Sequence, residues 1–349
     1  MPVGCTPLSR QRELKESNVS RYLEGIGLLS PGERARLEAA GDGNINWVRR
    51  ACAADGRSWI LKQARPALER FPDYAASPER LVFEARYYEI VHPFDTDGVC
   101  PRILHMDPEQ KVMVLEDLGD AERLDAAFAR GADVTSALET LAAFLGRVHR
   151  ETRDLDLAPR FANDEMRRLH GDHIFLLPYR ENEFPLSEAV AAAARDVWTD
   201  TELVARIDAA YERYLTPTGP LVHADVQAGN VLLPQGRPVL LDAEIAHAGD
   251  AAFDPGTLMA HVWLGAAGRG AIDAGDATAS RVWRAYAEAH GAANLPTFAD
   301  AARYAGIELL RRSLGAARVA AIEQDTAALA AIELGRRLAL DPPQSPDAL

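Results

Sequence analysis

The hydrophobic pattern of this 349-residue chain changes character near Gly119. Before this point, residues 45–48 and 58–62 predict a β-hairpin around Asp55-Gly56, and residues 112–115 predict a short buried strand. After it, helical periodicity dominates roughly 134–152, 187–214, 277–291 and 298–337, with a strand-like pair near 220–245. A strand-rich part followed by a helix-rich part predicts an α+β fold with two lobes.

We therefore expect three parts in the chain. Residues 1–118 would form an N-lobe built on a small antiparallel sheet, with helical patterns over 7–40 and 78–92. Residues 119–340 would form a mostly helical C-lobe, and the proline-containing residues 341–349 would form a loose tail.

Charge and composition limit the classes of partner. Asp and Glu total 52 and Lys and Arg total 38, so the net charge is −14, which disfavours nucleic acid and anionic membranes as partners. No apolar stretch approaches the roughly 20 residues of a membrane span. The three scattered cysteines indicate reduced thiols in a cytoplasmic protein. A homodimer is compatible with this sequence.

The strongest motif is His223-Ala224-Asp225, followed five residues later by Asn230. The spacing H-x-D-x-x-x-x-N is that of a kinase catalytic loop. In such a loop a carboxylate accepts the proton of the attacking hydroxyl, and an amide oxygen a few residues later holds Mg²⁺. The pattern predicts Asp225 as the base and Asn230 as a metal ligand.

A second acidic segment, Asp242-Ala243-Glu244, begins twelve residues after Asn230 and follows an apolar strand. A carboxylate at this place binds the metal ions that bridge the phosphates of ATP in kinases. Because residues two apart lie on the same side of a strand, Asp242 and Glu244 could share the metal. The alternative is an ordinary pair of surface carboxylates at a strand end.

The first part of the chain supplies candidates for nucleotide binding. Lys62 ends an apolar strand and can reach phosphate oxygens, and Glu84 on the next helix can hold it as an ion pair. The alternative for this pair is a solvated Lys and a helix-surface Glu. The turn that contains Gly43 and Asn44 would approach the phosphates, and the backbone between Glu116 and Leu118 would bind the adenine.

These motifs resemble the aminoglycoside phosphotransferase and choline kinase superfamily, and most closely the methylthioribose kinase family. The similar segments, which together span about 18–325, are Gly41-Asp42-Gly43-Asn44-Ile45-Asn46, Leu61-Lys62-Gln63-Ala64-Arg65-Pro66, Glu79-Arg80 with Glu84-Ala85, Asp242-Ala243-Glu244 and Arg311-Arg312. The resemblance implies a bilobal protein-kinase-like fold that binds ATP and Mg²⁺ between its lobes. It implies transfer of the γ-phosphate to a hydroxyl of a ribose-type sugar such as 5-methylthioribose.

The resemblance also assigns supporting residues. It implies that Asp254 anchors the catalytic loop near His223, and that Arg311 and Arg312 lie near the sugar. On a helix, Arg311 borders the apolar stripe, whereas Arg312 points away from it, so a solvated position is the alternative for Arg312. Ala224 departs from the family pattern, which has Gly there.

Two rival functions stay open at this point. The acceptor could be an aminoglycoside, an amino alcohol or another sugar, with acidic residues in the second lobe favouring a cation and arginines favouring a sugar. A chain of a different class would be a nucleotide-binding pseudokinase. The presence of Lys62, Asp225, Asn230 and Asp242 argues against the pseudokinase, because each could be lost without loss of the fold.

Overall fold

The computed structural model describes residues 11–40, 46–66, 76–157 and 159–349. Gly43 and Asn44, expected to approach the phosphates, lie outside the described residues. The chain divides into two compact units. The sheet unit contains residues 1–89 and 101–119, and the helical unit contains residues 90–100 and 120–349.

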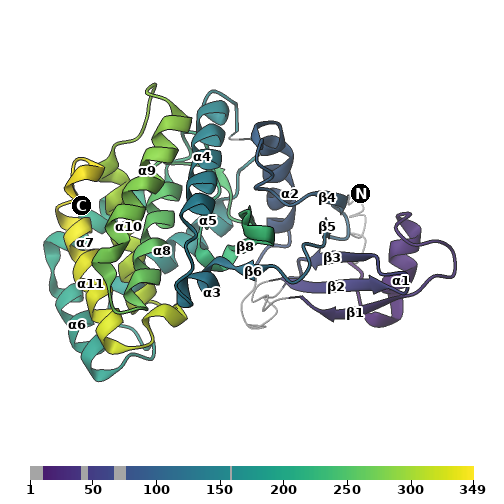
Figure 1. Ribbon diagram of the computed structural model, residues 1–349, viewed down its shortest axis with the longest axis horizontal. Helices are drawn as coiled ribbons and strands as arrows, with labels where there is room; N and C mark the ends of the chain where they lie inside the picture. Colours follow the sequence, from purple (N-terminus) through teal and green to yellow (C-terminus); the bar gives the residue numbers. More distant parts are fainter. Residues whose placement is uncertain (1–10, 41–45, 67–75, 158) are drawn as a thin grey trace, which may run out of the picture. The chain divides into compact units, whose positions relative to one another are not determined.

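The sheet unit is built on one antiparallel sheet with the strand order β1-β2-β3-β5-β4 (Figure 1). Its strands are β1 (Ala35–Ala39), β2 (Trp47–Ala53), β3 (Ser58–Gln63), β4 (Ile103–Asp107) and β5 (Val112–Glu116). The predicted hairpin and the predicted strand at 112–115 are therefore confirmed. Antiparallel pairing places Lys62 opposite Val48 on β2 and Met113 on β5, in the middle of the sheet.

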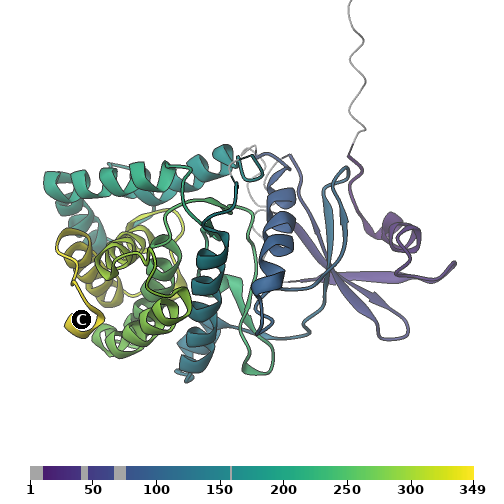
Figure 2. The same ribbon diagram turned by 90° about the horizontal axis from the view of Figure 1, so that it is seen from above.

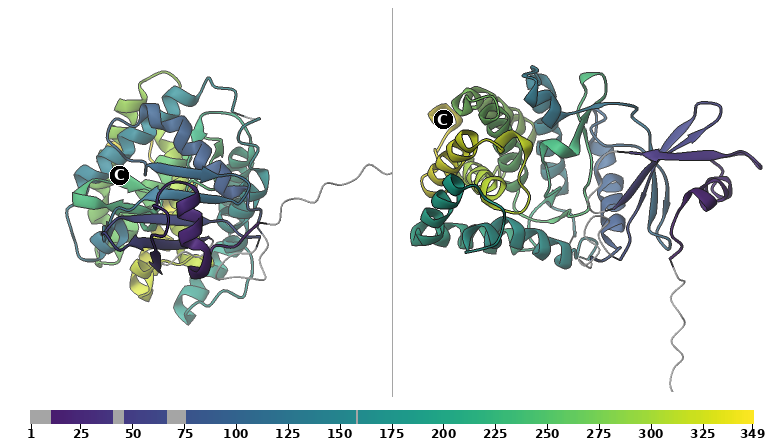
Figure 3. Two further views of the ribbon diagram at one scale, coloured as in Figure 1. Left: turned by 90° about the vertical axis from the view of Figure 1, so that its right-hand side faces the viewer. Right: turned by 90° about the horizontal axis from the view of Figure 1, so that it is seen from below.

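Helix α1 (Glu16–Gly25) covers one face of this sheet, as Figure 3 shows in purple. Its buried residues Val19 and Leu23 pack with Trp47, Leu61 and Val114 in one core. The expected helix through residue 40 is wrong in its second half, because residues 35–39 form β1. The helix ends at Gly25, and a Ser20 hydroxyl then binds the backbone of Ala35.

Helix α2 (Arg80–Val91) lies mostly in the sheet unit, and the helical unit contains the α-helices that follow it. They are α3 (Leu124–Ala129), α4 (Thr135–Thr152), α5 (Asp164–Gly171), α6 (Glu188–Thr199), α7 (Thr201–Leu215), α8 (Phe253–Ala267), α9 (Asp276–His290), α10 (Phe298–Leu314) and α11 (Asp325–Leu340). Helix α10 packs beside both α8 and α11, and α4 packs beside α9 (Figures 1 and 2). The helix predicted over 298–337 is two helices, since α10 ends at Leu314.

Short strands carry the loops of interest within this unit. They are β6 (Glu122–Arg123), β7 (Leu221–Val222), β8 (Val231–Leu233), β9 (Val239–Leu240) and β10 (His247–Ala248). The loop from His223 to Asn230 joins β7 to β8, and the Asp242 segment joins β9 to β10. Because β7 pairs with β10 and β8 pairs with β9, both loops are fixed at their ends. Helix α8 follows β10 and is buried on all sides. None of the described helices is long and apolar enough to cross a membrane.

Candidate active site

The loop that contains Asp225 is held by a buried carboxylate on α8. Asp254 accepts hydrogen bonds from the backbone N–H groups of His223 (2.8 Å) and Ala224 (2.9 Å), and it is fully buried. Burial raises the pKa of Asp254, but the contacts with His149 and His223 outweigh it, so the pKa lies below its usual value. Ala224 has φ +67°, a conformation that glycine adopts without strain, so the carboxylate fixes a strained turn.

His149 on α4 completes this support. Its Nε2 lies 3.2 Å from Asp254 Oδ2 and its Nδ1 lies 3.0 Å from the Tyr286 hydroxyl. Since a carboxylate only accepts, His149 Nε2 donates to Asp254. No sequence motif points to His149. The buried side chain in fact contacts the anchor of the loop.

The two carboxylate oxygens of Asp225 have different surroundings. Oδ2 accepts hydrogen bonds from Asn230 Nδ2 (2.7 Å) and Gln227 Nε2 (2.9 Å). Oδ1 lies 3.8 Å from His170 Nε2, which is beyond hydrogen-bond distance. The amide groups therefore orient the carboxylate through Oδ2 and leave Oδ1 as the oxygen that can accept a substrate proton.

The hydrogen bonds to Asp225 also fix the orientation of the Asn230 amide. Its Nδ2 donates to both the backbone oxygen and the Oδ2 of Asp225, so its Oδ1 points elsewhere and is left for a cation. Asp242, at the end of the next strand, is partly exposed and has φ +66°. Glu244 is buried, and its backbone oxygen accepts from Asn163 Nδ2 (2.9 Å).

This donor set fits Mg²⁺ in part. Amide and carboxylate oxygens are its preferred protein ligands, and nucleotide phosphates normally supply several others. The fit is strongest for Asn230, whose Oδ1 is not used to hold Asp225, and for Asp242, whose carboxylate is partly exposed at the end of the strand. Among the described residues, no group of three or more His, Cys, Asp or Glu could hold a metal by itself.

Lys62 and Glu84 form an ion pair in the sheet unit. Lys62 Nζ lies 2.7 Å from Glu84 Oε2, and the two side chains are only 5% and 1% exposed. Tyr88 donates to the other oxygen of Glu84 at 3.2 Å. The alternative of a solvated Lys and a surface Glu is therefore wrong. At the edge of the same unit, Glu116 ends β5 and accepts from the backbone N–H of Arg102, and Leu118 follows it.

A buried charge cluster lies on α10 of the helical unit. Glu308 Oε1 accepts from Arg312 Nε (2.6 Å), and both Glu308 oxygens accept from Arg311 Nη1 (3.1 and 3.0 Å). His261 Nε2 lies 3.4 Å from Glu308 Oε1. Burial raises the pKa of Glu308, but the two arginines lower it by more, so the carboxylate stays ionised. The solvated alternative for Arg312 is wrong, because its side chain is 5% exposed.

This cluster reaches Asp225 through His170, which Arg311 Nη2 approaches to 3.2 Å. Sequence reasoning missed both Glu308 and His170. A signal for Glu308 was present, because a Glu three and four residues before two arginines is a helical ion-pair pattern. No sequence signal pointed to His170, because only the tertiary structure brings α5, α10 and the Asp225 loop together. Arg311 Nε and Arg312 Nη2 are buried and have no hydrogen-bond partner among the described residues.

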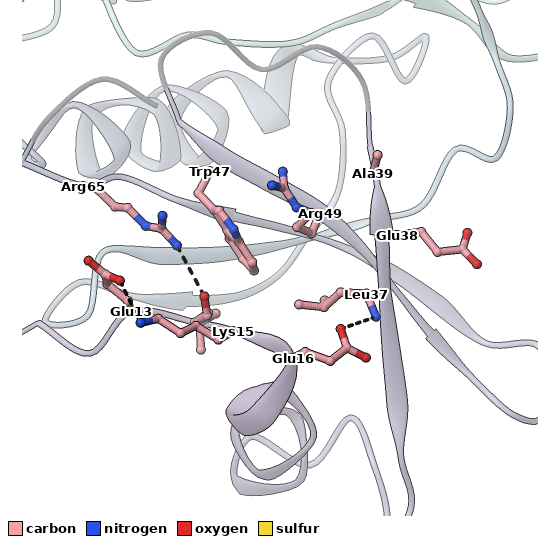
Figure 4. Close-up of a pocket in the computed structure, with 10 residues that line it drawn as sticks. Glu13, Lys15, Glu16, Leu37, Glu38, Ala39, Trp47, Arg49 and Arg65 are labelled. Carbon is pink, nitrogen blue, oxygen red and sulfur yellow. Dashed lines mark hydrogen bonds and ion pairs between the residues drawn. The ribbon is translucent and has the colours of Figure 1, made fainter. Parts of the chain in front are cut away.

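A cavity of about 450 Å³ in the sheet unit is separate from these residues (Figure 4). It is lined in part by Trp47, whose ring lies between Arg49 and Arg65 with guanidinium carbons 5.5 and 5.4 Å from its centroid. Trp47 pairs with Gln63, and alternate residues of a strand point to opposite faces. The cavity therefore lies on the face of the sheet opposite to Lys62.

Comparisons with solved structures show the fold. A choline kinase LicA from Streptococcus pneumoniae matches with a TM-score of 0.55 at 14% identity, covering 93% of this chain and 98% of that one. LicA has also been solved in complex with AMP, with the same TM-score. An amicoumacin kinase in complex with AMP-PNP, Ca²⁺ and Ami matches with a TM-score of 0.53 at 15% identity. The expected protein-kinase-like architecture is confirmed.

Comparisons with known sequences give the family. Methylthioribose kinase from Cronobacter sakazakii is 30% identical over 360 residues, covering 90% of this chain and 89% of the relative. Methylthioribose kinase from Bacillus velezensis is 26% identical over 97% of this chain. The model of the phosphotransferase enzyme family matches residues 36–290. The chain therefore belongs to the phosphotransferase enzyme family, as a small-molecule kinase with a hydroxyl acceptor.

Proposed function

We propose that this chain transfers the γ-phosphate of ATP to a hydroxyl of a ribose-type sugar, of which 5-methylthioribose is the first candidate. The observation that carries the proposal is the state of Asp225, whose Oδ2 is held by two amide donors and whose Oδ1 accepts no hydrogen bond from any residue that the structure describes. The similarity to methylthioribose kinases, at up to 30% identity, supports the choice of sugar.

In this proposal each residue of the site has a separate role. Lys62, held by Glu84, binds phosphate oxygens of ATP. Asn230 and Asp242 would hold Mg²⁺, with Glu244 as a further candidate, and the ion would neutralise charge that develops on the phosphates. Backbone groups between Glu116 and Leu118 would bind the adenine.

Asp225 Oδ1 orients the acceptor hydroxyl and takes its proton. The acceptor oxygen forms a bond to the γ-phosphorus while the bond from that phosphorus to ADP breaks. Asp254 and His223 position the loop and do not touch the reacting atoms. Catalysis then comes mainly from positioning and from neutralising charge in the transition state.

Charge argues against a cationic acceptor. Arg311 and Arg312 carry two positive charges, and Glu308 is the one carboxylate within 4.0 Å of either guanidinium among the described residues. The cluster therefore carries an excess positive charge close to Asp225, which would repel choline or an aminoglycoside. A planar guanidinium with an uncommitted N–H suits a sugar hydroxyl.

The test is ATP consumption by the purified protein with methylthioribose, ribose, other pentoses, choline, ethanolamine and an aminoglycoside. We expect turnover with a ribose-type sugar and none with the cations. Asp225→Asn should lower kcat by about 10²–10⁴-fold while ATP still binds and the chain stays folded. Preferred turnover of a cation would select the rival acceptor, and no turnover with any acceptor would select the pseudokinase.

A further inference from the structure

His170 lies between the proposed base and a guanidinium of the charge cluster. Its Nε2 is 3.8 Å from Asp225 Oδ1 and 3.2 Å from Arg311 Nη2. The side chain comes from α5, only 11% of it is exposed, and neither the sequence motifs nor the proposed mechanism assigns it a part.

The neighbours of His170 determine which ring nitrogen carries the proton. A guanidinium can only donate, so His170 Nε2 must accept from Arg311. The proton then resides on Nδ1, which faces the Tyr214 hydroxyl at 3.5 Å. Burial, and next the charge of Arg311, lower the pKa of His170 well below its usual value, in keeping with a neutral ring. The charged and titratable groups that act on the ring or contact it are Asp225, Arg311, Arg312, Glu308, His173 and Tyr214.

This arrangement has a consequence for Asp225. Since Nε2 presents a lone pair, it offers no proton to Oδ1, and Oδ1 stays open for the acceptor hydroxyl. A direct ion pair of Arg311 with Asp225 would instead place a permanently charged donor on Oδ1. That donor would compete with the hydroxyl and would make the carboxylate a weaker base.

We propose that His170 is a positioning residue, a neutral spacer that holds Arg311 through Nε2 and keeps Oδ1 of Asp225 free for the acceptor hydroxyl. The inference rests on the proposed function, in which Asp225 is the base. It adds a residue that acts through Asp225 and Arg311.

The first measurement needs no turnover. Long-range proton–nitrogen correlation spectra of the protein with ¹⁵N-labelled histidine report which ring nitrogen carries the proton. The His170 signal is identified by its loss in His170→Gln. We expect a neutral ring with the proton on Nδ1 at neutral pH. A protonated Nε2 would overturn the proposal.

The second measurement is steady-state kinetics on the preferred acceptor. His170→Ala frees Arg311 and should lower kcat by about 10–100-fold, the scale of a misplaced catalytic group, while the KM for ATP is unchanged. His170→Gln should recover most of this loss, because its amide oxygen can accept from Arg311 in place of Nε2. Wild-type kcat in His170→Ala, or no recovery in His170→Gln, would contradict the role.

A double-variant cycle separates this role from simple packing. In the Arg311→Met background there is no guanidinium to hold, so adding His170→Ala should produce little further loss of kcat. Full additivity of the two losses would overturn the proposal. His92→Gln changes an exposed histidine of the same unit and is the matched control, with unchanged kcat. If the wild-type protein transfers no phosphate to any hydroxyl, the proposed function itself fails, whereas a protonated Nε2 in an active enzyme removes only the role of His170.

Discussion

Glu308→Gln tests whether one buried carboxylate holds the arginine cluster together. In the native chain Glu308 accepts from Arg311 at 3.0 and 3.1 Å and from Arg312 at 2.6 Å, and all three side chains are at most 6% exposed. Glutamine keeps the size of the side chain but removes its charge and turns one acceptor oxygen into a donor. Two buried guanidinium groups then lose their shared counter-charge.

The expected loss follows from this geometry. Removing one partner of a buried ion pair typically destabilises a protein by about 3–5 kcal/mol, because the remaining charge stays buried. We expect a loss in this range, since no other carboxylate among the described residues lies within 4.0 Å of Arg311 or Arg312. The KM for the acceptor should also rise, because Arg311 and Arg312 lose the carboxylate that orients them close to Asp225.

The assay is urea unfolding followed by circular dichroism, with Glu333→Gln as the matched control. Glu333 is exposed on α11, and its neutralisation should change the free energy of unfolding by less than about 0.5 kcal/mol. Adding Arg312→Met to Glu308→Gln removes one uncompensated charge and should recover part of the loss. A loss in Glu308→Gln no larger than that of Glu333→Gln would refute the reasoning.

Three further predictions concern the loops and a buried histidine. Asp242→Asn, which tolerates the positive φ of this position, should raise the Mg²⁺ concentration needed for half-maximal activity; unchanged metal dependence would exclude Asp242 as a ligand. Asp254→Asn should cost about 1–3 kcal/mol in urea unfolding and lower kcat, because it disrupts the bonds that hold the His223 and Ala224 backbone; a stable, fully active variant would contradict this anchor. Burial lowers the pKa of His247 to about 4. As the pH falls, this imidazole is therefore protonated in the unfolded chain before it is protonated in the folded protein. The contribution of His247 to stability is therefore intact above about pH 6.5, declines as the pH falls from there, and by about pH 4 has dropped by up to about 3 kcal/mol. Urea unfolding of His247→Asn across this pH range should show a smaller decline than the wild type, and an equal decline would exclude the effect.

Several elements followed from local pattern alone. Helices α2 (Arg80–Val91), α4 and α9 match the predicted ranges, because each has a clear period or a turn residue at its end. The β2–β3 hairpin forms around Asp55-Gly56 as predicted, although β2 covers Trp47–Ala53 and not 45–48. Helix α8 was missed, since every one of its residues is buried and an apolar helix without a polar face shows no period. Strand β1 was taken for helix because its five residues, which include Ala, Leu and Glu, favour a helix locally.

The residues of the site likewise divide into those that local spacing predicts and those that it does not. Asp225, Asn230 and the Asp242 segment stood out because their spacing is set within one loop or one strand end. Ala224 was noted only as a departure from glycine, and its positive φ explains why glycine is usual there. Arg312 was left with a solvated alternative because a single helix period cannot show that α10 is buried between α8 and α11.

Local patterns were enough to predict the strand-rich and helix-rich parts and the order of the chemical groups, because periodicity and loop spacing are local properties of the chain. The packing of distant elements, by contrast, established that Arg312 is buried and that His170 stands between Arg311 and the base. These contacts join residues that are up to about 140 positions apart. Distances between such residues depend on how helices pack, which no local pattern encodes.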